Sequence, residues 1–135
     1  MNKNICVFLI LSLSFLLLQS CDKETTSPMP LNVERNIQFV LYTDKDFSDD
    51  DHNISFSIFV RDDNKTILDS AVATMKVKEI PGEANKITIN RTIITAPSTE
   101  LMAGFVYEIE HVGVSWYLDT IAANQNNKTV EFAFQ

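Results

Sequence analysis

The chain has 135 residues, and 45 % of them are apolar, which indicates one globular domain. It carries 11 basic against 18 acidic residues, a formal net charge of −7 at pH 7. Because affinity for nucleic acid comes mainly from clustered Lys and Arg, we expect no nucleic-acid partner.

The N-terminus predicts a signal peptide over residues 1–20. Lys3 precedes an apolar segment over residues 5–18, which is too short to span about 30 Å of hydrocarbon but has the length of a signal-peptide hydrophobic region. Residues 18–21 read Leu-Gln-Ser-Cys and resemble the lipobox of bacterial lipoproteins. The resemblance implies cleavage before Cys21 and a diacylglycerol on its thiol, so that the membrane is a partner through this lipid. An ordinary secretory signal is the alternative.

The residues behind Cys21 predict an address and a tether. Asp22-Lys23-Glu24 resembles the cluster of Lys and acidic residues that directs lipoproteins of Bacteroidetes-type bacteria to the cell surface. This implies a lipid-anchored protein of the outer membrane, and the periplasmic face is the alternative. Residues 21–35 contain Pro28 and Pro30 and predict an extended tether of up to about 3.1 Å per residue.

Residues 36–135 predict a single all-β domain, because their apolar residues alternate and helical spacing is not sustained. Turn-forming sequences such as Pro81-Gly82 separate the alternating segments. We expect seven strands near residues 37–41, 54–60, 67–77, 87–93, 105–109, 114–118 and 130–134, the third kinked near Ser70. This pattern is typical of an antiparallel β-sandwich of immunoglobulin-like or transthyretin-like type, and a small β-barrel is the alternative.

Aromatic residues occupy both phases of this alternation. In the sixth segment, Trp116 shares the apolar phase and is expected in the core. Tyr42, Phe59 and Tyr117 fall on the polar phase of their strands. They either cover the second face of a sheet or form an exposed patch that marks an interaction surface.

The sequence offers no recognisable catalytic motif. It has no G-x-S-x-G turn, its three glycines are isolated, and His52 and His111 lack the spacing of zinc ligands. Cys6 lies in the predicted signal peptide and Cys21 is predicted to be lipidated, so we expect no disulfide. The protein is therefore predicted not to be an enzyme and to hold no cofactor, calcium excepted.

The most acidic segment contains five aspartates within residues 44–51: Asp44, Asp46, Asp49, Asp50 and Asp51. At about 4 Å, each pair of like charges costs roughly 1 kcal/mol even in bulk water. Calcium takes six to eight oxygens from flexible loops, so a calcium-binding, C2-like sandwich is one hypothesis. The EF-hand pattern fails, because Asp49 stands where Gly is required. A solvated acidic loop is the alternative.

Strand direction predicts where this loop lies. If consecutive strands are antiparallel, the connections alternate between the two ends of the sandwich. The loop over residues 44–52 then shares one end with the turns at 81–82 and 110–113, and the loops near 62–65, 97 and 122–128 share the other. The tether enters at this second end, so we expect the acidic loop to face away from the membrane.

Two short sequences predict modification, and the whole pattern favours a binding role. Asp69-Ser70-Ala71 and Asp119-Thr120-Ile121 resemble the acceptor sequence of O-glycosylation in Bacteroidetes-type bacteria, which implies glycans on Ser70 and Thr120.

We expect a non-enzymatic accessory or adhesion-type domain on a lipid tether. It would bind a protein or glycan partner through its distal loops or an exposed sheet face.

Overall fold

A computed structural model describes residues 31–63 and 65–135. The predicted signal peptide, Cys21 and residues 22–30 of the tether lie outside the described residues. The described chain contains seven strands, which confirms the all-β prediction: β1 (Val33–Thr43), β2 (Asn53–Arg61), β3 (Thr66–Lys76), β4 (Ile87–Thr95), β5 (Leu101–Ile109), β6 (Gly113–Ile121) and β7 (Asn127–Phe134). Two short 3-10 helices, η2 (Val77–Glu79) and η3 (Glu83–Asn85), join β3 to β4. No helix in the described part has the length and apolar character needed to cross a bilayer.

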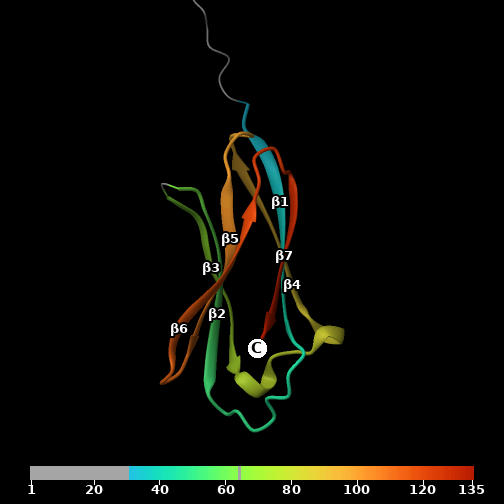
Figure 1. Cartoon of the computed structure of the whole chain (residues 1–135), viewed down its shortest axis with the longest axis vertical. Helices are drawn as coiled ribbons and strands as arrows, with labels where there is room; N and C mark the ends of the chain where they lie inside the picture. Colours follow the sequence, from blue (N-terminus) through green and yellow to red (C-terminus); the bar gives the residue numbers. More distant parts are fainter. Residues whose placement is uncertain (1–30, 64) are drawn as a thin grey trace, which may run out of the picture.

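The strands form two sheets that pack face to face (Figure 1). One has the order β4-β1-β7 and the other the order β3-β2-β5-β6. No described strand is hydrogen-bonded across the two sheets, so the barrel alternative is wrong and the sandwich is confirmed. In an immunoglobulin-like sandwich the first two strands are neighbours in one sheet. Here β1 and β2 lie in different sheets, so the strand order differs from that of an immunoglobulin domain.

One strand pair departs from the predicted antiparallel pairing. Each connection reverses the chain, so odd-numbered strands run one way and even-numbered strands the other (Figure 1). β1 therefore pairs antiparallel with β4 but parallel with β7, because both β1 and β7 are odd-numbered. The remaining pairs, β2 with β3, β2 with β5 and β5 with β6, are antiparallel.

The same alternation places the loops as predicted. At one end, the Thr43 N–H donates to the carbonyl of Pro81 at 2.9 Å. At the other end, the Asn124 N–H donates to the carbonyl of Pro97 at 2.6 Å. The described chain starts at this second end, and the acidic loop over residues 44–52 lies at the opposite end (Figure 1).

The core between the sheets is rich in aromatic rings. Phe132 of β7 contacts several of them, with ring centroids 5.1 Å from Tyr117, 5.5 Å from Tyr107 and 5.7 Å from Phe105. Every fully packed member of the core cluster falls within residues 37–134. Within the residues that the structure describes, both sheets contribute to this one core cluster.

The expectation that Trp116 lies in this core is wrong. Its exposed fraction is 65 %, and the neighbouring Tyr117 turns inward instead. Both phases of β6 contain apolar residues, so the local alternation does not decide which face is buried. Contacts with β7 decide it: Tyr117 stacks on Phe132, and Asp119 Oδ2 lies 2.7 Å from Lys128 Nζ. A shift of one residue would exchange the two faces of the strand.

The boundaries of two strands also differ in detail from the prediction. β1 begins at Val33, so the last three residues of the predicted tether belong to the sheet. Arg35 is fully buried, and its Nη2 donates to the carbonyls of Ala96 at 3.1 Å and Pro97 at 2.8 Å. These bonds fix the connection between β4 and β5 against β1. β3 is one unbroken strand, and its register against β2 shifts at Val72, two residues after Ser70, where we expected a kink or a split.

Candidate functional site on the outer face of the four-stranded sheet

Apolar side chains gather on the outer face of β2, β5 and β6. Residues in register across a sheet share a face, and Trp116 is in register with Val106, which is in register with Ser57. The group, which we call the apolar patch, consists of Phe59, Met102, Val106, Val114, Trp116 and Leu118. Four of its members are among the large apolar side chains with more than a third of their surface exposed.

A shallow depression of about 480 Å³ lies within the apolar patch. It is lined by Phe59, Val106, Trp116 and Leu118 and by the more polar Arg61, Thr66 and Asp69. Gly104 explains why it is hollow. This residue lies in register between Phe59 and Leu118, and a Cβ built on it would come within 1.9 Å of the carbonyl oxygen of Tyr117. No side chain therefore fills the space between the two apolar neighbours.

Polar residues surround the apolar patch. Arg61 lies at one end, where its Nη2 contacts Met102 Sδ at 3.4 Å. Asp69 is exposed on the β3 side, and Glu108 is exposed next to Val114. An apolar centre with a polar rim is the composition of a surface that binds another macromolecule.

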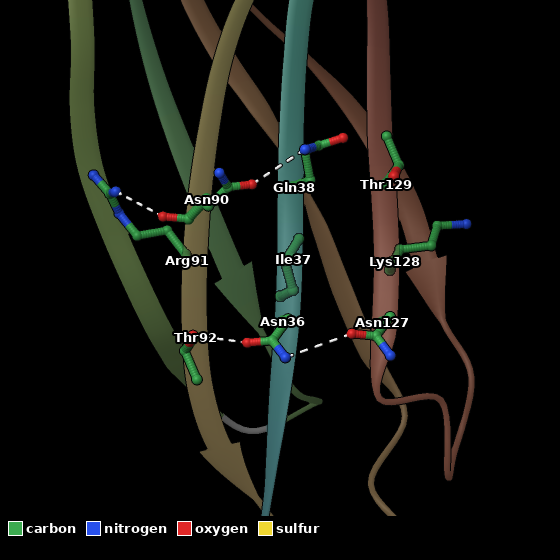
Figure 2. A pocket seen from close by; sticks show the side chains of 9 residues that line it. All are labelled: Asn36, Ile37, Gln38, Asn90, Arg91, Thr92, Asn127, Lys128 and Thr129. Carbon is green, nitrogen blue, oxygen red and sulfur yellow. Dashed lines mark hydrogen bonds between the residues drawn. The ribbon is translucent and has the colours of Figure 1, made fainter.

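The outer face of the three-stranded sheet has the opposite character (Figure 2). Asn36 of β1 lies in the middle: its Nδ2 donates to Asn127 Oδ1 at 3.5 Å, and its Oδ1 accepts from Thr92 Oγ1 at 2.8 Å. In the next row, Gln38 Nε2 donates to Asn90 Oδ1 at 3.2 Å. The side chains of this face largely satisfy one another across the strands, and they stabilise the sheet.

The structure spreads the five aspartates along the acidic loop rather than gathering them. Asp46 Oδ1 accepts the Ser48 N–H at 3.0 Å, which lowers the pKa of the Asp46 carboxyl. Asp50 Oδ1 contacts His52 Nδ1 at 2.7 Å and accepts the His52 N–H at 3.0 Å, and these bonds lower the pKa of Asp50. Both carboxylates are therefore bound within the loop.

A third aspartate of the loop, Asp51, forms ion pairs with two lysines. Lys76 is the last residue of β3, and Lys78 lies in η2. Its Oδ1 lies 2.7 Å from Lys78 Nζ and 2.9 Å from Lys76 Nζ. Hydrogen bonds from Lys78 and then Lys76 lower the pKa of Asp51 from 3.8 to about 2. The same contacts raise the pKa of Lys76. The ammonium groups of Lys76 and Lys78 therefore neutralise the Asp51 carboxylate.

The remaining predicted ligands, Asp44 and Asp49, are exposed. Over residues 31–63 and 65–135, no group of three or more His, Cys, Asp or Glu side chains is arranged to hold a metal ion. The calcium hypothesis stays a prediction, and the described residues offer it no preformed site.

The two predicted modification sites lie in different surroundings. Thr120 is exposed on the outer face of β6, in register with Met102 of the apolar patch. Ser70 is half-buried in β3, and its Oγ donates to the carbonyl of Ala71 at 3.5 Å. Glycosylation of either residue stays a prediction.

Sequence reasoning located the apolar patch only in part. Of the three aromatic residues on the polar phase, Phe59 belongs to the patch, Tyr117 belongs to the core, and Tyr42 is half-buried on the outer face of β1. Burial and the neighbouring Glu131 raise the pKa of Tyr42. The signal that could have found the patch is the segment 113–118, which contains no charged residue in either phase.

Comparison of the chain with protein-family models, with curated proteins and with solved structures found no match. The function is therefore inferred from the residues themselves.

Proposed function

We propose that this is a lipid-anchored envelope protein without enzymatic activity, whose β-sandwich binds another protein through the apolar patch. The observation that supports this most directly is Trp116, which exposes 65 % of its surface beside Val114, exposed by 58 %. Contiguous apolar surface on a folded domain is characteristic of interaction sites. Tryptophan is also among the residues that contribute most to protein–protein binding.

The neighbours of Trp116 favour a protein over a glycan. Val106, Val114 and Leu118 are aliphatic and offer no hydrogen bonds to the hydroxyl groups of a sugar. Only two charged side chains, Arg61 and Asp69, line the depression. A partner surface with an apolar centre matches this arrangement better than a polyhydroxyl chain does.

The anchor is supported by the lipobox-like residues 18–21 and by the cluster over residues 22–24. We favour the cell surface over the periplasmic face. The tether would then enter at the end of the sandwich where β1 begins (Figure 1). The apolar patch extends along the strands, so it would point sideways from this axis and remain accessible to a neighbouring protein.

A capture experiment with a matched control tests this function. Trp116→Ala removes the centre of the patch, and Ile94→Ala removes a side chain of equal exposure, 65 %, from the other sheet. Residues 22–135 are immobilised and exposed to solubilised envelope proteins, and both variants are checked for an unchanged circular dichroism spectrum. We expect the wild type and Ile94→Ala to retain the same protein and Trp116→Ala to lose it. Retention by all three, or Trp116-dependent binding to a glycan array alone, would overturn the proposal.

A further inference from the structure

The four edge strands of the two sheets differ in how they are protected against pairing with another strand. Natural edge strands are usually interrupted by bulges or carry Lys, Arg or Pro. β3 is shifted in register at two places against β2, β4 carries Arg91, and β7 carries Lys128 and Glu131. β6 has no shift of register and no Lys, Arg or Pro, and its one charged side chain, Asp119, is paired with Lys128. Its pairing with β5 is continuous from Gly113 to Ile121.

The single charge on β6 is already neutralised. Asp119 is the only ionisable acidic or basic side chain on the strand, and its Oδ2 lies 2.7 Å from Lys128 Nζ. The edge therefore presents no net charge to an incoming strand, although the whole chain carries −7. Charges farther away on the domain are screened over about 8 Å at physiological ionic strength.

The backbone of β6 directs hydrogen-bonding groups away from β5. The carbonyl oxygen of Tyr117 approaches Gly104, so it faces β5. In an antiparallel strand the phases alternate, and Trp116 and Leu118 therefore direct their N–H and C=O groups to the free edge. The Thr120 N–H belongs to this same phase and donates to Asp119 Oδ1 at 2.7 Å.

We propose that the protein bound by the apolar patch is a second copy of this chain, which pairs antiparallel along β6 and joins the two four-stranded sheets into one. This inference rests on the proposed function. β6 is complementary to itself: with a two-fold axis at Tyr117, Trp116 lies opposite Leu118 of the second copy. Both residues point to the outer face, so the two apolar patches merge into one.

The symmetry of this pairing decides where the two tethers leave. A two-fold axis perpendicular to the sheet reverses the strand direction of the second copy. β1 begins at the end of the domain where β6 finishes, because odd and even strands run oppositely (Figure 1). The two chains therefore enter the dimer from opposite ends. Copies anchored in two facing membranes would therefore join those membranes. Each single interface is small, but many copies acting in parallel would raise the overall strength of the link.

The pairing is tested by measuring the oligomeric state of residues 22–135, which contain the whole core, by sedimentation equilibrium over a dilution series. We expect a monomer–dimer equilibrium in the wild type and in Ile94→Ala. Leu118→Pro removes an N–H at the free edge and should abolish the dimer, and Trp116→Ala should weaken it at least tenfold. Val114→Lys places a charge on the edge and serves as a second blocking variant if Leu118→Pro does not fold.

A wild type that stays monomeric at its highest soluble concentration would overturn the pairing. If it also retained a different envelope protein through Trp116, the proposed function would stand and only the identity of the partner would be wrong. A dimer unaffected by both blocking variants would equally overturn pairing through β6.

The arrangement of the tethers is tested with the lipidated full chain in two differently labelled populations of phosphatidylcholine vesicles. We expect the populations to cluster when both carry the protein, and clustering to be lost with Leu118→Pro. Clustering when only one population carries it would show lipid binding and overturn the inference. If dimers form but the vesicles do not cluster, the dimer would stand and the inference that it joins two membranes would be wrong.

Discussion

Gly104→Ala adds one methyl group at the closest approach between β5 and β6. The new Cβ would lie 1.9 Å from the Tyr117 carbonyl oxygen, 2.9 Å from its carbon and 3.1 Å from the Cα of Leu118. All three are backbone atoms, so no rotation of a side chain relieves the overlap. To restore ordinary van der Waals contact at about 3.4 Å, β6 must move by about 1.5 Å, because its backbone atoms cannot rotate away from the new methyl group.

This movement breaks the hydrogen bonds nearest Gly104 and overpacks the sheet. Two lost backbone hydrogen bonds cost about 2 kcal/mol, and overpacking costs typically 1–3 kcal/mol. We expect the free energy of unfolding to fall by roughly 3–5 kcal/mol. For a domain of this size the melting temperature should fall by about 15 °C.

Urea denaturation followed by far-ultraviolet circular dichroism measures this change. Gly82→Ala is the matched control, because the nearest atom to its new Cβ is the Thr43 oxygen at 3.9 Å and its φ is −70°. The control should be neutral or more stable by about 0.4–1 kcal/mol, since Ala loses less chain entropy on folding. An unfolding free energy of Gly104→Ala within about 1 kcal/mol of the wild type would refute the reasoning.

Three further predictions concern the core and the acidic loop. Phe132→Ala removes a ring that contacts Phe105, Tyr107 and Tyr117 and should lower the unfolding free energy by about 3–5 kcal/mol in the same assay. The Asp51 carboxyl should titrate by NMR at about 2, and nearer 3.8 in Lys78→Gln. Because its pKa is lowered on folding, its contribution to stability is present above about pH 4 and is lost as the pH falls through about 2. Millimolar calcium, compared with a chelator, should leave the melting temperature unchanged; a rise of several degrees would show that residues 44–51 bind the ion after all.

Periodicity and strand direction were sufficient to predict most of the fold. The alternation of Ile54, Phe56 and Ile58 leaves only one face to bury, so β2 was predicted correctly. The reversal of the chain at every connection also placed the acidic loop at the correct end. The parallel pairing of β1 with β7 follows from this same reversal, but only once those two strands are known to be neighbours.

The candidate site depends on contacts that are distant in sequence, so it was predicted less well. Apolar residues occupy both phases of β6, and the choice between Trp116 and Tyr117 is made by Phe132 on another strand. Similarly, Lys78 lies far along the chain from Asp51, so the sequence did not indicate that these two side chains form an ion pair. Local pattern identifies a strand, whereas packing between strands decides which of its faces meets solvent.

The position of β1 determines how the domain would respond to a pulling force. β1 is the middle strand of its sheet, bonded to β4 on one side and β7 on the other, and the chain enters the domain at its first residue. Tension arriving from that end acts along the strand and strains both ladders of hydrogen bonds together in shear. An edge strand would instead be peeled away one bond at a time. We therefore expect β1 to be among the mechanically strongest parts of the described domain.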